Sequence, residues 1–165
     1  MADVKMKQVF LFLFFCCTLL SAQKREKVKI DSLILIGRYQ LALDQLSTLP
    51  DSYEKYSQMG NINYQIDKTL LAIDYYLKAL QQEEKYKTKV QLGKAYQKVK
   101  SYEKAIEVFE SIIENDPKNL LIKYQLGKLY LKKRRANQAI KIFEELAKSD
   151  FTNPNYPYQK AVAYA

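Results

Sequence analysis

Apolar residues recur along most of this chain at intervals of three and four positions, which is the spacing of one face of an α-helix. Short polar stretches interrupt this pattern at regular distances. The pattern predicts an all-α chain built from pairs of helices joined by tight turns. The predicted helices cover residues 24–36, 39–49, 53–65, 68–83, 86–99 and 102–115, and the same rhythm continues beyond them.

Small and aromatic residues recur within this helical pattern at a fixed period of 34 positions. Four positions share the period, so the chain contains an internal repeat. The paired residues are Gly93 and Gly127, Tyr96 and Tyr130, Ala105 and Ala139, and Phe109 and Phe143.

The spacing of these residues has a simple physical meaning. Gly93 and Ala105 fall on two successive helices, where small side chains let the helices approach closely at their crossing point. Tyr96 and Phe109 lie one turn further along the same faces, where their rings are expected to fill the widening gap. A single helix pair of this kind cannot bury its apolar face, so the pairs are expected to stack.

The residues after the second helix of the pair predict how the next repeat starts. Asp116 is expected to cap the next helix, and Pro117 is expected to occupy its first position.

The combination Leu-Gly-x-x-Tyr, Ala-x-x-x-Phe and Pro resembles the tetratricopeptide repeat family, and the resemblance covers nearly the whole chain after residue 22. It implies an α-solenoid of stacked antiparallel helix–turn–helix repeats. The positions that carry the repeat signature are Gly60, Ala72, Tyr76, Gly93, Tyr96, Ala105, Phe109, Pro117, Gly127, Tyr130, Ala139 and Phe143.

The repeats divide the chain after residue 22 into about four units. Their predicted boundaries are 23–52, 53–85, 86–119 and 120–153, and the first helix of a fifth unit follows at 154–165. The second unit is imperfect, because Asn63 stands where the later units have tyrosine and the neighbouring Tyr64 is expected to take its place. The unfinished fifth unit has two interpretations: the polypeptide continues, or this edge packs against another molecule.

The first 22 residues have the order of a secretory signal peptide. Lys5 and Lys7 precede an apolar run at residues 9–20, and small residues follow up to Ala22. A run of twelve residues is shorter than the roughly 20 that a membrane-spanning helix needs. Cleavage near Ala22 is expected, which makes the protein periplasmic or secreted; a retained, buried or anchoring helix is the alternative. Either Met1 or Met6 could be the start.

Composition argues against an enzyme. The chain has no histidine, and its two cysteines, Cys16 and Cys17, lie inside the predicted signal peptide. The rest of the chain therefore lacks a histidine to act as general base, to activate a nucleophile or to bind a metal, and it lacks a cysteine nucleophile. It also lacks a glycine-rich phosphate loop. We expect no catalytic residue, metal, cofactor or small-molecule substrate.

Charge is distributed unevenly along the chain. Residues 23–84 carry 8 basic and 9 acidic side chains, whereas residues 85–165 carry 17 basic and 8 acidic side chains. The second half is thus strongly basic, which favours an acidic partner.

The family resemblance also implies where a partner binds. Ligand contacts in the family come from the first helix of each pair, on the concave side of the solenoid. The residues that match these positions and carry a lysine or tyrosine side chain are Lys87, Lys94, Lys98, Tyr124, Lys128, Lys132 and Tyr158. Ammonium groups and rings in alternation suit an extended peptide that bears carboxylates. The alternative is that these lysines only keep an exposed helix face in solution.

Two other anionic partners, a nucleic acid and an envelope surface, are conceivable for a basic chain. Residues 132–135 are four consecutive basic residues at a predicted turn, which is typical of a solvated loop. Nucleic-acid binding needs a basic face, but it is not expected of an exported protein. An anionic envelope surface remains an alternative partner.

These observations predict an exported, non-enzymatic scaffold that binds a protein or peptide. One alternative is the sensor or envelope-assembly portion of a longer signalling protein. Another is a cytosolic module whose apolar amino terminus is never cleaved.

Overall fold

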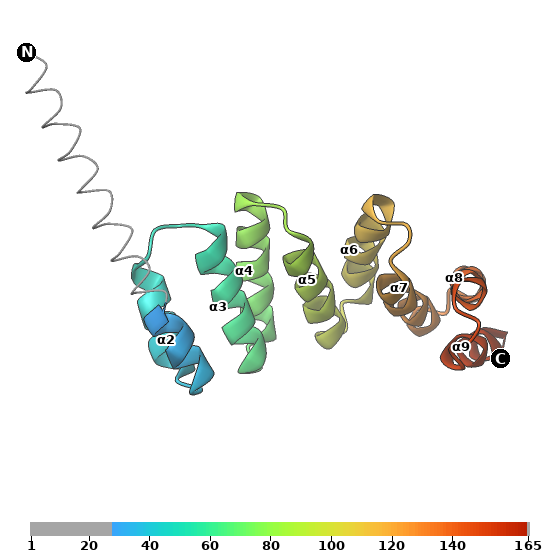
Figure 1. The fold of residues 1–165 in the computed structure, drawn as a ribbon, viewed down its shortest axis with the longest axis horizontal. Coiled ribbons are helices and arrows are strands. Elements are labelled where there is room, and N and C mark those ends of the chain that lie inside the picture. The colour runs from blue at the N-terminus through green and yellow to red at the C-terminus, as the bar shows by residue number, and fades with distance from the viewer. Residues whose placement is uncertain (1–27, 165) are drawn as a thin grey trace, which may run out of the picture. The chain divides into compact units, whose positions relative to one another are not determined.

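The structure is a computed structural model, and it describes residues 28–164. All regular elements in this range are α-helices, without a β-strand among them (Figure 1). The predicted signal peptide lies outside the described residues. None of the helices between residues 28 and 164 combines the length and the apolar character needed to cross a membrane. The helices fall into two compact units, residues 1–50 and residues 51–165.

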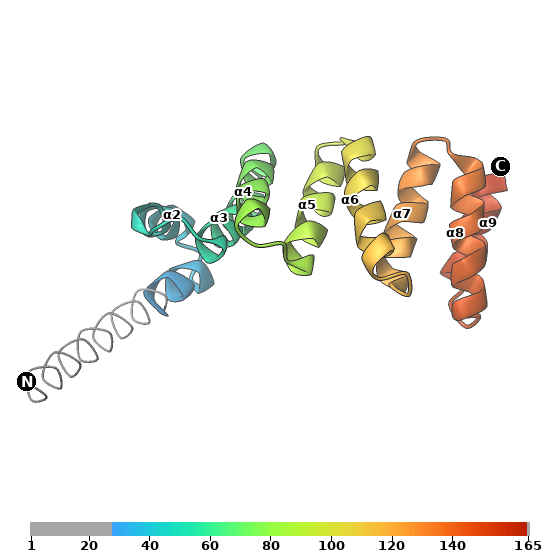
Figure 2. The same cartoon turned by 90° about the horizontal axis from the view of Figure 1, so that it is seen from above.

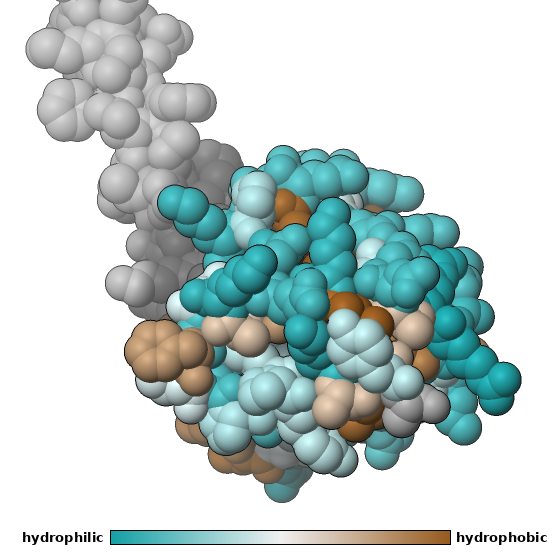
Figure 3. Space-filling model, turned by 90° about the vertical axis from the view of Figure 1, so that its right-hand side faces the viewer, coloured by the Kyte–Doolittle hydropathy of each residue, from teal (hydrophilic) through white to brown (hydrophobic). Residues whose placement is uncertain are grey.

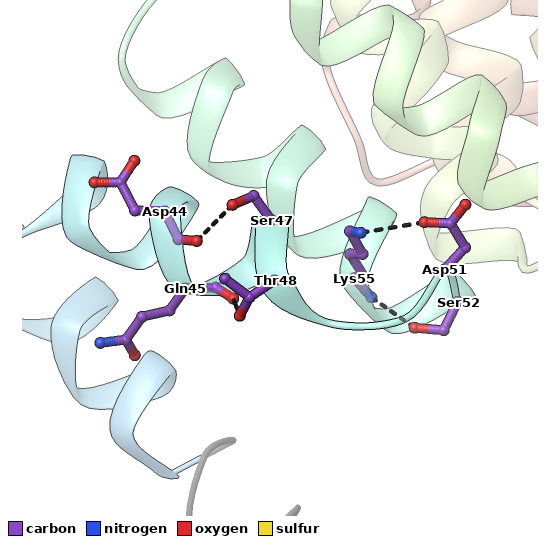
Figure 4. A network of polar contacts seen from close by, with 7 residues as sticks. All are labelled: Asp44, Gln45, Ser47, Thr48, Asp51, Ser52 and Lys55. Carbon is purple, nitrogen blue, oxygen red and sulfur yellow. Dashed lines mark hydrogen bonds and ion pairs between the residues drawn. The ribbon is translucent and has the colours of Figure 1, made fainter.

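In the first unit, residues 28–35 are helical and α2 (Tyr39–Thr48) follows a turn at Gly37. Ala42 is fully buried, in agreement with its predicted small-residue position. Figure 4 shows the end of α2, where the Ser47 and Thr48 hydroxyls donate hydrogen bonds to main-chain carbonyls three residues earlier. These bonds satisfy carbonyl groups near the helix terminus.

The second unit is a row of helical hairpins. Each helix packs against the next one along the chain, and α3 also contacts α5 (Figures 1 and 2). The predicted α-solenoid class is confirmed. The helices are α3 (Tyr53–Gln65), α4 (Thr69–Gln82), α5 (Tyr86–Lys98), α6 (Tyr102–Asn115), α7 (Leu120–Lys132), α8 (Ala136–Ser149) and α9 (Asn155–Tyr164).

The second unit begins with a capped helix. The Ser52 hydroxyl accepts a hydrogen bond from the main-chain N–H of Lys55, and the Lys55 ammonium group forms an ion pair with Asp51 at 3.1 Å (Figure 4). A serine cap of this kind typically stabilises a helix by about 1 kcal/mol.

Each complete hairpin of the second unit is closed by an aromatic ring that lies on a glycine. A Cβ atom added to Gly93 would lie 2.4 Å from the Phe109 ring, and one added to Gly127 would lie 2.7 Å from the Phe143 ring. Gly60 is covered in the same way by Tyr76. The atoms nearest to these glycines belong to aromatic rings, so the glycine makes room for a ring of the next helix.

The predicted cap of the helix that follows α6 is wrong. Asp116 ends α6, Pro117 lies in the following turn, and α7 begins only at Leu120. Asn119 is the cap, because its side-chain oxygen accepts a hydrogen bond from the Ile122 N–H. Its amide group also donates to the Asp116 carboxylate. An asparagine that binds both sides of the turn is a better cap than the aspartate three residues earlier.

In the imperfect second repeat, a polar side chain is buried where the later repeats bury a tyrosine. Asn63 is 1% exposed, and its amide group donates a hydrogen bond to the Met59 carbonyl. Its side-chain oxygen has no hydrogen-bond partner. Asn63 itself occupies the buried position that Tyr96 and Tyr130 hold in the later repeats, and its neighbour Tyr64 packs half-buried against the core.

Candidate functional site

Four of the predicted ligand-binding lysines lie on two successive first helices of the repeats. Lys87 and Lys94 are exposed on α5, and Lys132 is exposed and Lys128 half-buried on α7. Lys94 and Lys128 hold the same register, because they are 34 positions apart. No ion pair joins these four lysines to a carboxylate within the described part of the chain.

Two of these lysines line a shallow depression of about 320 Å³ between α7 and α9. Lys128, Leu131 and Lys132 form one side, and Gln159 of α9 forms the other. The site therefore combines two ammonium groups, an apolar side chain and an amide group. The sequence missed Gln159, because the repeat register singles out its neighbour Tyr158, which is 64% exposed and does not line the depression.

Tyr124 of α7 contacts Lys128 and links α7 to α8 and α9. Its ring packs edge-on against Phe143 of α8 and at an angle against Tyr156 of α9, with ring centroids 6.1 and 5.8 Å away. The Lys128 ammonium group lies 4.9 Å from the centroid of the Tyr124 ring, within the range of a cation–π contact. Tyr124 therefore positions Lys128 and joins three helices.

Lys98 differs from the other predicted lysines, because it already has an acidic partner. Its ammonium group lies 2.6 Å from the Asp67 carboxylate and 4.5 Å from the centroid of the Tyr64 ring. The hydrogen bond from Lys98 lowers the pKa of Asp67, and the same bond raises the pKa of Lys98. Lys98 thus connects two successive repeats and contributes less free charge to the surface than the sequence suggested.

The repeat-signature residues stand apart from this surface. Ala105, Phe109, Ala139 and Phe143 are fully buried, so their role is to hold the helices together. Within the described residues, no three His, Cys, Asp or Glu side chains are close enough together to hold a metal ion.

Residues 96–161 match the family model of the tetratricopeptide repeat. The matched stretch runs from the end of α5 into α9 and contains the whole depression. A comparison with curated proteins finds no match.

Solved structures of tetratricopeptide repeat proteins share the fold. A tetratricopeptide repeat protein from Parabacteroides merdae superposes with a TM-score of 0.76 at 18% identity, over 85% of this chain and 58% of that protein. MamA from Desulfovibrio magneticus RS-1 gives 0.73 at 19% identity, over 85% of this chain and 82% of MamA. The protein YrrB gives 0.70 at 17% identity, over 82% of this chain and 72% of YrrB. This chain therefore spans little more than half of the Parabacteroides protein.

The tetratricopeptide repeat fold explains why the depression forms where it does. The first helices of neighbouring repeats lie close together, since α3 contacts α5 and one depression is lined by both α7 and α9. Side chains of α7 and α9 therefore line one site although they are about one repeat apart in sequence.

Proposed function

We propose that this chain is an exported scaffold that binds an acidic segment of a partner protein along α5, α7 and α9. The depression formed by Lys128, Leu131, Lys132 and Gln159 is the observation that carries the proposal. Lys94 extends the row of positive charge onto α5. The family resemblance implies that these residues line the concave side of the solenoid.

The chemistry of the depression suits a peptide with carboxylates beside apolar side chains. Two ammonium groups attract carboxylates, and this attraction mainly sets specificity and the rate of association. Leu131 offers an apolar contact, and the Gln159 amide group can both donate a hydrogen bond to a peptide main chain and accept one from it. A small-molecule substrate fits poorly, because the depression is shallow and has few polar groups that converge.

Two of the similar structures point in the same direction. YrrB is a tetratricopeptide repeat protein with an unusual peptide-binding site, and a chain of the Cut9–Hcn1 hetero-tetramer also has a similar fold, with a TM-score of 0.65 at 18% identity. Protein or peptide partners are thus found among proteins of this fold. The alternative, a sensor or envelope-assembly portion of a longer protein, uses the same surface and differs in what the rest of that protein does.

The binding surface is tested by reversing its charge. We expect the triple variant Lys94→Glu, Lys128→Glu and Lys132→Glu to bind acidic peptides about 10-fold more weakly or worse, because each exposed charge pair contributes up to about 1 kcal/mol. The peptides are first selected from a random displayed library against the full chain. Affinity is then measured by fluorescence anisotropy with labelled synthetic copies.

A second triple variant with the same change in net charge is the control. Lys118, Lys141 and Lys148 are exposed and lie outside the depression, so their replacement by glutamate should leave affinity within about 3-fold of the original. Selection of basic peptides, or equal losses in both variants, would contradict the proposal. Circular dichroism should show equal helix content in all three proteins.

Export is tested separately from binding. Cleavage near Ala22 predicts a mature chain that begins at Gln23, which the intact mass of the protein from its native host would show. A mass that includes residues 1–22 would contradict export by cleavage.

A further inference from the structure

The turns inside the repeats form a second basic surface, which shares Lys132 with the depression and otherwise consists of other residues. We call it the turn edge, and it comprises residues 66–70, 98–104 and 132–137. Eight basic and two acidic residues lie in these segments. The basic residues are Lys68, Lys98, Lys100, Lys104, Lys132, Lys133, Arg134 and Arg135, all exposed except the half-buried Arg135.

Ion pairs show that the three segments of the turn edge are neighbours. The Asp67–Lys98 pair joins the first segment to the second. Glu103 joins the second to the third, with contacts of 3.0 Å to Lys133 and 2.6 Å to Arg135. In Figure 1 the α3–α4 and α5–α6 turns lie at the lower ends of their helices, opposite the α4–α5 and α6–α7 loops.

The opposite ends of the helices do not share this charge. The loops at residues 83–85, 116–119 and 150–154 carry four acidic and two basic residues. Positive charge is therefore concentrated on one edge of the second unit. Both acidic residues of the turn edge are already held in ion pairs, so they neutralise only part of that charge.

Only some of these basic residues lie where a positive charge stabilises a helix. Lys98 and Lys132 lie in the last turns of α5 and α7, where positive charge is favourable. Lys68 and Arg135 instead precede the first residues of α4 and α8, and Lys104 lies in the first turn of α6. Positive charge at the start of a helix is unfavourable by a few tenths of a kcal/mol up to about 1 kcal/mol. An anionic partner would compensate for this cost.

The outermost positions of the turns present their charge to solvent. Lys100 and Arg134 adopt left-handed backbone conformations, with φ of 60° and 57°. Glycine is the usual residue there, as at Gly37 in the first unit. Leu70, on the same edge, is 70% exposed. The edge thus combines cations at its tips with an exposed apolar side chain.

We propose that the turn edge docks the protein on an anionic lipid surface. Each lysine or arginine near such a surface contributes about 1 kcal/mol of attraction. An exposed leucine can enter the boundary between headgroups and acyl chains. A single-stranded nucleic acid would favour aromatic side chains on which bases stack, but the edge's one tyrosine, Tyr102, is half-buried. The two surfaces share only Lys132, so this docking leaves Lys128, Leu131 and Gln159 of the depression to the partner protein.

Sedimentation with lipid vesicles tests the proposal on the full chain. We expect the protein to bind vesicles of phosphatidylcholine and phosphatidylglycerol more strongly than vesicles of phosphatidylcholine alone, and added salt to remove the difference. The triple variant Lys100→Glu, Lys104→Glu and Arg134→Glu should reduce the partition coefficient for the anionic vesicles by about 100-fold or more. The apolar run at residues 9–20 would bind both kinds of vesicle, so the difference between them isolates the charge.

Matched variants identify the surface and the ligand. The Lys118, Lys141 and Lys148 triple variant changes net charge equally and should retain most of the anionic-vesicle binding. Leu70→Ser should weaken vesicle binding and leave binding to a short DNA duplex unchanged. Equal losses in the two triple variants would overturn the turn edge as the docking surface. Strong binding to DNA with no preference for anionic vesicles would overturn the lipid assignment.

Discussion

Replacing Phe109 with alanine is expected to lower the free energy of unfolding by about 3–5 kcal/mol. Its ring is 0% exposed and lies on Gly93 at the centre of the α5–α6 hairpin. The neighbouring helices cannot close the cavity without moving apart from their next neighbours, because the α5–α6 hairpin is packed on both sides, against α4 and α7. Urea denaturation followed by circular dichroism measures the loss.

A double-mutant cycle with Gly93 tests whether the glycine exists to make room for this ring. Gly93→Ala alone should destabilise the protein by about 1–3 kcal/mol, because its Cβ would overlap the ring. In the Phe109→Ala background the same substitution should be neutral or stabilising by up to about 1 kcal/mol, since alanine favours helix over glycine. Additive effects of the two substitutions would contradict the proposed contact.

Alkaline pH is expected to unfold the protein through two buried tyrosines. Burial is the main cause that raises the pKa of both Tyr76 and Tyr130, and the hydrogen bond from the Tyr130 hydroxyl to Glu110 raises the pKa of Tyr130 further. In the unfolded chain both hydroxyls ionise near pH 10, while in the folded chain they keep their protons. The folded state then binds more protons, so stability is complete below pH 10 and falls as the pH rises above it. Each tyrosine contributes a loss of up to about 1.4 kcal/mol per pH unit.

The slope of stability against pH, measured by urea denaturation between neutral and alkaline pH, tests this prediction. Tyr76→Phe and Tyr130→Phe should each make the alkaline slope shallower. Each should also lower stability at neutral pH by about 1–3 kcal/mol, because Asn61 and Glu110 lose a hydrogen-bond donor. Tyr158→Phe is the control, since the Tyr158 side chain is 64% exposed. An unchanged slope in both buried-site variants would contradict the prediction.

The lysine ion pairs respond to alkaline pH in the same direction. Hydrogen bonds to Asp67, Glu83 and Glu144 raise the pKa of Lys98, Lys85 and Lys160, respectively. Their contribution is present at neutral pH and is lost as the pH rises through the lysine pKa values. It is common to all the tyrosine variants, so it cancels in the comparison of slopes.

The surface of the second unit presents further apolar groups that the tests above leave in place. Figure 3 shows its C-terminal end, where hydrophilic side chains surround separate apolar patches. Phe151 and Tyr164 are exposed in this region. The vesicle and peptide experiments compare variants that keep both residues, so these side chains contribute equally throughout.

The helical repeat and its register were predictable because they are properties of local sequence. Periodic apolar positions and the 34-residue spacing place α3 to α6 within one or two residues of their observed bounds. The cap of α7 was misjudged, because aspartate and asparagine are both good helix caps and both Asp116 and Asn119 precede this helix. Only the hydrogen bonds that Asn119 makes across the turn distinguish them.

The candidate surfaces were less predictable, because they join side chains from different helices. Sequence register identified Lys128 and Lys132 but not Gln159, which reaches the depression through the packing of α9 on its neighbours. It also did not show that Lys98 is paired with Asp67, since an ion pair between two turns depends on how the repeats stack.

By itself, the sequence determined that this protein is a helical repeat, where its helices lie, and that its second half is basic. These features follow from the spacing and composition of residues, which can be read directly from the sequence. The tertiary structure alone decided that Phe109 covers Gly93, that Lys98 is paired, and that three separate turns form one basic edge. Such contacts depend on distances in space between residues about 15 to 35 positions apart, and stacking of the hairpins sets those distances.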